Sequence, residues 1–383
     1  MILTLRILVV CPWFYRGDAV GEAARRTVLA LSAEQGFEVG AIATLSDFDD
    51  IDVAICEGVE NLLLHPLFLA ADVIIYVFAI HHPFFDAIVL GNGNASQIVR
   101  FHNVTPKTLM PPQHHHVIDR SFRQMQIFQF ADEIWADSRE NSEELLRQGL
   151  PSERIEIVPI AAPALIKARL ADKQIDPVRI AYVGRFFPSK GVLDLVDMAT
   201  LLEGRLDFEL HLYGNLRFSD PEYVEAVRAR IESSPAKSRI HLVGSVSDSQ
   251  LAEAYGAAAI FVTGSGHEGF CVPVIEAMAA GCVPVSYPLT NLKYVANDLG
   301  RLALGVRPED LANAVLEVAK ALSDSRELPL DRGSTSVEDF DHLSAAYVDG
   351  FSVEAFAKNV VARVRQVRRQ SVWSVSINQT LQD

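Results

Sequence analysis

Two glutamates, Glu268 and Glu276, stand in the second half of the chain with seven residues between them. The stretch that holds them reads as a strand, a glycine-punctuated turn and a helix, over Ile260–Thr263, Gly264–Phe270 and Val274–Ala280. Such a unit leaves unpaired backbone N–H groups at the helix start, with the positive end of the helix dipole behind them. The stretch therefore predicts an anion site, most naturally for phosphate.

The carboxylates of these two residues limit the kinds of ligand that the site could bind. A carboxylate beside a phosphate site is costly unless it binds hydroxyls, so the pair favours a ligand that carries phosphate and sugar together. The alternative is that Glu276 lies on a solvated helix face and Glu268 is an ordinary turn acid. The glycine-rich turn between strand and helix favours the first interpretation.

Two basic residues, Arg185 and Lys190, stand in another predicted strand-to-helix loop, between a strand over Arg179–Gly184 and a helix over Val192–Leu202. Two fixed cations at such a place suit a diphosphate, which gains charge as it leaves. A solvated loop with two basic residues is the alternative.

The turn also contains Gly264, Gly266 and Gly269, a literal G-x-G-x-x-G. This pattern is typical of dinucleotide sites when it opens the first βαβ unit and an acidic residue follows about 20 residues later. Here the motif lies deep in the second half, and the next strand, Val283–Tyr287, ends without a carboxylate. An NAD-dependent oxidoreductase is therefore the least favoured class.

These motifs resemble those of a known family. His267–Phe270, Glu276–Gly281 and Val283–Val285 resemble the Glu-x(7)-Glu signature of the family 4 glycosyltransferases, and Arg185 and Lys190 resemble its G-R-x(4)-K-G segment. The resemblance implies a GT-B fold, an α/β architecture of two Rossmann-like doubly wound domains facing each other across a cleft. It also implies retaining transfer of a sugar from a nucleotide-sugar donor. Because Arg185 and Lys190 would supply cations at the diphosphate, we expect neither a metal nor a separate cofactor.

The resemblance assigns a role to each matching residue. Arg185 and Lys190 would hold the diphosphate, and Glu276 would bind the ribose hydroxyls. Glu268 would hold the sugar with the backbone N–H groups that follow it, at Gly269, Phe270, Cys271 and Val272. Cys271 stands where the family usually has glycine. Nucleotide-base contacts are expected near Gly244 and Val246.

The first half of the chain alternates predicted strands with helices, which indicates a doubly wound sheet whose ligands bind at the carboxyl ends of the strands. Gly17 lies in a loop at one such end and resembles the family's glycine-rich turn, although a plain connector also needs glycine there. His102 follows the strand Gln97–Phe101, and the resemblance implies that it contacts the sugar. A lone histidine is otherwise usually structural.

Other potential ligands give weaker patterns. His114–His116 follow two prolines in what reads as a mobile loop, and because adjacent side chains diverge, three in a row rarely bind one ion. The four cysteines lack C-x-x-C spacing, so reduced thiols are expected rather than a zinc site or disulfides. A net charge of −15 argues against a nucleic-acid partner.

The chain of 383 residues exceeds what one core usually holds. We expect a first domain over 1–165 and a donor domain over 176–365, with a tail from about 366 to 383 packing back on the first. The segment Asp331–Asp341 reads as a loop. The apolar amino terminus is interrupted by Arg6 and reads as a buried strand, so a cytoplasmic protein is expected. Basic residues cluster near the end of the chain, at Arg363, Arg365, Arg368 and Arg369. They would either form a solvated helix end or touch anionic lipid at the inner face of a membrane.

The favoured function is transfer of a sugar to a hydroxyl of a glycan or lipid-linked acceptor. The segment around His102 looks like enzymes that build bacterial surface polysaccharides, which favours mannose from GDP-mannose. A nucleotide-sugar epimerase and a non-catalytic binding protein of the same fold are the alternatives.

Overall fold

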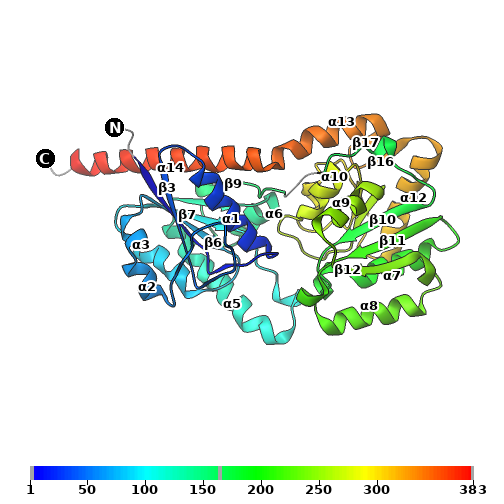
Figure 1. Ribbon diagram of the computed structural model, residues 1–383, viewed down its shortest axis with the longest axis horizontal. Helices are drawn as coiled ribbons and strands as arrows, with labels where there is room; N and C mark the ends of the chain where they lie inside the picture. Colours follow the sequence, from blue (N-terminus) through cyan, green and yellow to red (C-terminus); the bar gives the residue numbers. More distant parts are fainter. Residues whose placement is uncertain (1–3, 163–165, 381–383) are drawn as a thin grey trace. The chain divides into compact units, whose positions relative to one another are not determined.

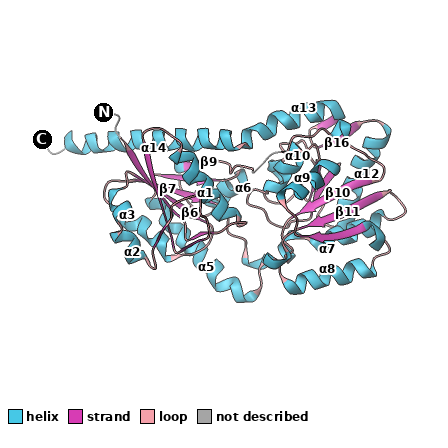
Figure 2. Cartoon of the chain, in the orientation of Figure 1, coloured by secondary structure: helices cyan, strands magenta, loops and turns pink. Residues whose placement is uncertain are grey.

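Two α/β units, each built on a parallel sheet, make up the protein. The computed structural model describes residues 4–162 and 166–380, with side chains as far as residue 367. The first unit comprises Met1–Lys107, Pro111–Ala161 and Val353–Asp383, and the second comprises Thr108–Met110 and Ala162–Ser352. In each unit the strands run through the interior and the helices lie outside them (Figure 1, Figure 2).

The first unit has a seven-stranded sheet in the order β5-β3-β1-β6-β7-β8-β9, with every pairing parallel. The chain winds outward from β1 to β5 and then returns to β6 and continues the other way, which confirms the expected doubly wound sheet. The strands are β1 (Leu5–Val10), β3 (Phe37–Ala43), β5 (Ala54–Ile55), β6 (Val73–Phe78), β7 (Ser96–Phe101), β8 (Glu133–Ala136) and β9 (Ile155–Ile157), and a separate parallel pair is formed by β2 (Trp13–Phe14) and β4 (Leu45–Ser46).

Helices cover both faces of this sheet, because alternate side chains of a strand point to opposite faces. Ile74 and Tyr76 of β6 are buried in one cluster with residues of the short helices, and Val73 and Ile75 are buried in another with residues of the first and last helices. The helices are α1 (Ala19–Ser32), α2 (Val59–Leu64), α3 (Pro66–Ala70), α4 (Ala87–Leu90), α5 (His115–Gln124), α6 (Arg139–Arg147) and α14 (Val353–Thr380).

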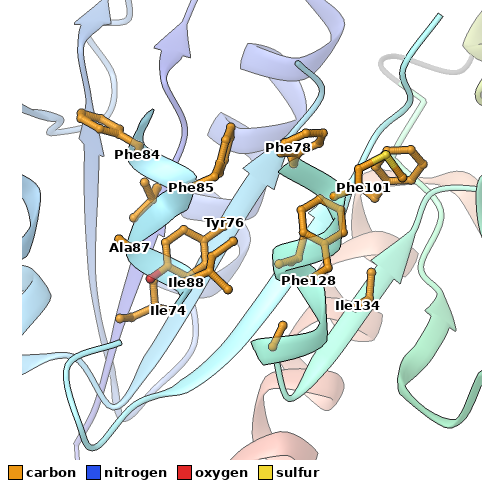
Figure 3. Packing of buried hydrophobic residues seen from close by; sticks show 14 of the residues in the cluster. Ile74, Tyr76, Phe78, Phe84, Phe85, Ala87, Ile88, Phe101, Phe128 and Ile134 are labelled. Atoms are coloured by element: carbon orange, nitrogen blue, oxygen red, sulfur yellow. The ribbon is translucent and has the colours of Figure 1, made fainter. Parts of the chain in front are cut away.

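A cluster of aromatic side chains fixes the carboxyl ends of β6 and β7. The Phe78 ring lies 4.8 Å from the rings of both Phe85 and Phe128, measured between centroids, and it also stacks on Phe101 (Figure 3). All four rings are fully buried. Because His102 follows Phe101 directly, this packing sets the position from which the His102 side chain leaves the sheet.

The second unit has a six-stranded parallel sheet in the order β12-β11-β10-β13-β14-β15, and an antiparallel hairpin of β16 and β17. The strands are β10 (Val178–Val183), β11 (Phe208–Tyr213), β12 (Ile240–Gly244), β13 (Ile260–Thr263), β14 (Val283–Ser286), β15 (Arg301–Leu302), β16 (Glu327–Leu330) and β17 (Gly333–Ser336). The helices are α7 (Val192–Leu202), α8 (Pro221–Ser233), α9 (Asp248–Ala257), α10 (Val272–Ala279), α11 (Leu292–Val295), α12 (Pro308–Asp324) and α13 (Val337–Val348). This sheet also reverses its winding, at β10.

Two segments predicted as loops are ordered elements. Asp331–Asp341 contains all of β17 and the start of α13. Ser336 caps the helix by accepting a hydrogen bond from the Asp339 N–H, and Val337 and Phe340 are buried. The segment at His114–His116 likewise enters α5 at His115. In both cases a polar composition conceals an amphipathic helix.

The return of the chain to the first unit begins earlier than the expected residue 366. It starts at Val353, because Phe356, Val360, Val364 and Val367 of α14 are buried against the first unit's core and α14 packs on α1. Figure 1 shows α14 running along this unit.

Two arginines of the basic cluster are engaged on the first unit. Arg363 donates to Glu156 at 2.6 Å, and Arg365 pairs with Glu34. The side chains of Arg368 and Arg369 lie outside the described residues. Among the described residues, every helix is too short or too polar to cross a membrane.

Candidate functional site

Two loops at the carboxyl edge of the second sheet meet backbone to backbone. A Cβ on Gly191 would lie 2.0 Å from the Gly264 carbonyl oxygen, so neither loop could approach the other if residue 191 carried a side chain. Gly191 also has a φ of 62°, a conformation that favours glycine. The Gly266 N–H donates to the Ser189 carbonyl at 2.9 Å and ties the same two loops together. Gly264 and Gly266 therefore join loops within one sheet.

This junction brings Lys190 and Glu268 together. Lys190 ends a 3₁₀ turn after β10, Glu268 follows β13, and the Lys190 Nζ lies 2.7 Å from the Glu268 Oε1. The side chains are 22% and 12% exposed, respectively. A lysine ammonium has three donors, so it can keep this partner and still bind a phosphate oxygen. The ion pair places a cation and a hydroxyl-binding carboxylate at one point of the sheet edge.

Arg185 stands on the same loop as Lys190 but is exposed. Its guanidinium lies over the Phe187 ring, 5.4 Å from the centroid. Within the described residues Arg185 makes no ion pair with a carboxylate, so its charge is available to an anionic ligand. The ring restricts the guanidinium without neutralising it.

The backbone after Glu268 is held in place by residues that sequence reasoning did not identify. The Glu268 N–H donates to Thr290 Oγ1 at 2.9 Å, and the buried Asn291 side chain donates to the Phe270 carbonyl at 2.8 Å. The Phe270 ring packs against Phe351, with centroids 5.6 Å apart. Thr290, Asn291 and Phe351 thus hold the loop that follows Glu268.

Cys271 caps α10 in the left-handed conformation, with a φ of 76°. That conformation explains why the family usually has glycine here, since a Cβ is disfavoured in it. Burial raises the pKa of the Cys271 thiol well above its ordinary value, and the Glu268 carboxylate raises it further. The thiol is therefore neutral beside the site, where α10 begins at Val272.

Glu276 lies inside α10 and is half-buried. The Tyr255 hydroxyl donates to its Oε2 at 3.1 Å. Burial raises the pKa of Tyr255, and the neighbouring carboxylate adds to the rise, so the hydroxyl stays a donor. Tyr255 was not identified from the sequence, because only tertiary contact reveals a partner 21 residues away. Gly244 ends β12 with a φ of 80°, and Val246 lies in the loop that follows.

In the first unit, His102 belongs to a buried group of three side chains. Its Nδ1 lies 2.5 Å from Asp137 Oδ2, and the other oxygen of Asp137 lies 3.0 Å from Arg100 Nη2. Arg100 is fully buried and also donates to the Val158 carbonyl. Burial lowers the pKa of Arg100, and Asp137 opposes the shift. Sequence reasoning did not identify Asp137 as a partner, because it follows a neighbouring strand.

The other ring nitrogen of His102, Nε2, is left for a ligand. His102 is 8% exposed, and Nε2 makes no hydrogen bond among the described residues. Because Asp137 accepts from Nδ1–H, Nε2 is the acceptor in the neutral ring. An unpaired buried polar atom is costly, which is typical of a group kept for a ligand.

Gly17 lies in an exposed loop with a φ of 75°, next to Asp18, which caps α1. A cavity of about 240 Å³ opens beside this loop at the carboxyl ends of β1 and β6. Its walls are mostly apolar or aromatic, and they include Trp13, Tyr15 and Phe85. Residues of this loop therefore line the cavity, and Gly17 lets the loop turn.

Comparison with known proteins fits this geometry. Residues 169–334 match the family described as glycosyl transferases group 1. The matched residues all lie in the second unit. The resemblance to the family 4 glycosyltransferases is thereby confirmed.

Two bacterial relatives share a stretch of sequence with the chain. It is 30% identical over 163 residues to the O-antigen chain mannosyltransferase B of Escherichia coli, covering 42% of this chain and 41% of that protein. It is also 30% identical over 126 residues to the GDP-mannose:cellobiosyl-diphosphopolyprenol alpha-mannosyltransferase of Komagataeibacter xylinus, covering 32% and 31%. The chain thus matches less than half the length of these curated relatives.

The fold is shared over nearly the whole chain. The structure of HepE from Anabaena in complex with UDP-glucose superposes with a TM-score of 0.70 at 14% identity, covering 94% of this chain and 99% of that one. At this identity the likeness shows the fold, and the fold is GT-B.

Proposed function

We propose that the protein is a retaining glycosyltransferase that moves a sugar from a nucleotide-sugar donor to an acceptor hydroxyl. The observation that carries the proposal is the Lys190–Glu268 ion pair at the junction of two strand-to-helix loops. A cation suits the diphosphate that leaves, and a carboxylate suits the hydroxyls of the sugar. A nucleotide sugar carries both of these groups, the diphosphate and the sugar hydroxyls.

Each residue has a distinct part in the proposal. Arg185 and Lys190 stabilise negative charge on the leaving diphosphate, which grows as the glycosidic bond breaks. Glu276, oriented by Tyr255, accepts hydrogen bonds from the ribose hydroxyls. Glu268 and the backbone N–H groups up to Val272 hold the transferred sugar. His102 presents Nε2 as an acceptor for a sugar hydroxyl.

For the donor we propose GDP-mannose, and for the acceptor a hydroxyl of a glycan or lipid-linked glycan. Two mannosyltransferases among the relatives support this choice, one of O-antigen chains and one named for GDP-mannose. The HepE structure holds UDP-glucose, so a protein of the same fold takes another donor and the choice needs a direct test. A role in bacterial surface polysaccharide synthesis is part of the same proposal.

The test is binding followed by turnover. Thermal shifts against GDP-mannose, UDP-glucose, UDP-N-acetylglucosamine and ADP-glucose should show one clear preference. With the preferred donor, release of the nucleoside diphosphate should require an added glycan acceptor, and the Arg185→Ala, Lys190→Ala double variant should be inactive. Donor turnover without acceptor that yields a rearranged nucleotide sugar would instead indicate an epimerase, and binding without any turnover would indicate a non-catalytic binding protein.

The proposed chemistry needs no metal ion, since two side-chain cations serve the diphosphate. Initial rates should therefore be unchanged after treatment with EDTA. A loss of rate that Mg²⁺ or Mn²⁺ restores would refute metal independence and would leave the donor assignment standing.

A further inference from the structure

Three potential metal ligands gather on one face of the second sheet, within strands β11 and β12. Glu209 and His211 are two residues apart on β11, so their side chains point to the same face. His241 on the adjacent strand β12 is the direct register partner of His211. The opposite face of β11 carries Phe208, Leu210 and Leu212, all of which are fully buried.

The donor atoms are close enough to converge. One ligand atom from each of Glu209, His211 and His241 lies within 4.8 Å of the others. The two imidazole rings are 4.5 Å apart between centroids, and His211 Nε2 lies 3.3 Å from Glu209 Oε2. Ligands of a tetrahedral Zn²⁺ at 2.0–2.1 Å are about 3.3 Å from one another. Small side-chain rotations on a fixed sheet would therefore bring the three atoms into coordination distance.

We propose that Glu209, His211 and His241 form a binding site for a divalent transition-metal ion, best matched by Zn²⁺. Two imidazole nitrogens and one carboxylate oxygen are a ligand set that zinc uses, and imidazole suits zinc and its neighbours better than Mg²⁺ or Ca²⁺. The evidence for this site does not rest on the proposed transferase activity.

The surroundings fit a bound ion. Arg179 on β10 is the register partner of Glu209 and lies 3.4 Å from its Oε2. Ligating carboxylates are commonly held by such an outer partner, and Glu209 has a second oxygen to offer. A groove of about 350 Å³ reaches His211 and is also lined by Gln250 and Glu253 of α9, so an ion has a route from solvent and oxygen donors nearby. The three side chains are half-buried.

The position of the ligands defines what the ion would do. β12 is the edge strand of the sheet, and its register with β11 shifts between Leu212 and Tyr213, just after His211. An ion shared by His211 and His241 would link the two strands immediately before this irregularity. It would therefore stabilise the edge strand that ends at Gly244.

The experiment uses the full chain, stripped with a chelator and dialysed, then titrated with ZnCl₂ against a chromogenic zinc indicator. We expect one tightly bound equivalent, weakened about tenfold or more in His211→Gln and in His241→Gln, on the scale seen when a metal site loses a supporting group. The matched control replaces His114, His115 and His116 with glutamine and should keep the tight equivalent. The four cysteines are buried and do not compete in the folded chain.

A second readout separates binding from misfolding. Without metal, both glutamine variants should melt like the wild type, and added ZnCl₂ should raise the melting temperature of the wild type and the control alone. Binding that persists in His211→Gln and His241→Gln, or that disappears in the control, would overturn the proposal. Absence of any tight equivalent would reduce the cluster to an ion-pair network of Arg179, Glu209 and His211. Donor binding is a separate measurement, which tests the active site.

Discussion

Replacing Glu268 with glutamine should tighten the binding of a nucleoside diphosphate, although it slows transfer. The Glu268 carboxylate occupies one donor of the Lys190 ammonium, with Oε1 2.7 Å from Nζ. A diphosphate that binds another donor of the same ammonium places a second negative charge nearby. Glutamine keeps the shape of the side chain and removes that repulsion.

The size of the effect follows from the geometry. Two oxygens on neighbouring donors of a tetrahedral ammonium are about 4.5 Å apart. Unit charges at that distance repel by about 1 kcal/mol in water and by about 4 kcal/mol at an effective dielectric constant of 20. Since the side chains of Lys190 and Glu268 are 22% and 12% exposed, solvent screens part of the repulsion. We expect about 1–2 kcal/mol, or roughly 5- to 30-fold in the dissociation constant.

Calorimetry with GDP and with UDP measures the change in the dissociation constant directly. Lys190→Met should weaken binding of the preferred nucleotide, and the double variant should bind better than Lys190→Met, because the repulsion that Glu268→Gln removes acts directly between the carboxylate and the diphosphate. Glu222→Gln, at an exposed position of α8, makes the same change in net charge and should have no effect. If Glu268→Gln weakens the nucleotide as much as Lys190→Met does, the carboxylate binds the nucleotide and the assigned division of roles is wrong.

Four further outcomes are expected. Arg185→Ala should lower kcat about 100-fold or more at an unchanged melting temperature, and a change in KM alone would show that it only binds substrate. Glu276→Gln should weaken the binding of GDP about tenfold in calorimetry, whereas Tyr255→Phe, which removes only the orienting hydroxyl, should weaken it less. Equal GDP affinity in Glu276→Gln and the wild type would show that Glu276 does not bind the ribose. His102→Asn should reduce kcat per folded molecule more than it reduces stability, and unchanged rates with a lower melting temperature would make the residue structural. Burial lowers the pKa of His82 from 6.5 to about 4, so the unfolded state takes up the proton first and the free energy of unfolding should fall as the pH drops from about 6.5 towards 4. After discounting for solvent exposure, the loss is about 1–2 kcal/mol. Urea unfolding at pH 7 and pH 4.5 should show that the stability of His82→Asn depends less on pH than that of the wild type.

The sequence by itself determined the two parallel sheets and the anion-binding loops of the second unit. Strands such as β6 are continuous apolar runs because both faces of a parallel sheet are covered. Such runs can be recognised in the sequence without any knowledge of tertiary contacts. The spacing from Glu268 to Glu276 could be read for the same reason, since both residues lie in one local strand-turn-helix unit. The cap of α6 is local in the same way, because the Ser138 side chain accepts a hydrogen bond from the Asn141 N–H.

Tertiary structure alone decided which side chains meet. Lys190 and Glu268 are 78 residues apart, and their pairing depends on a backbone contact between Gly191 and Gly264 that no local pattern encodes. Asp137 reaches His102 because β7 and β8 are neighbours in the sheet. Local sequence also did not predict β17 and α13, because this polar segment becomes ordered only through the surface against which it packs. Local free energies act within a few residues along the chain, whereas these contacts arise only when distant elements are packed together.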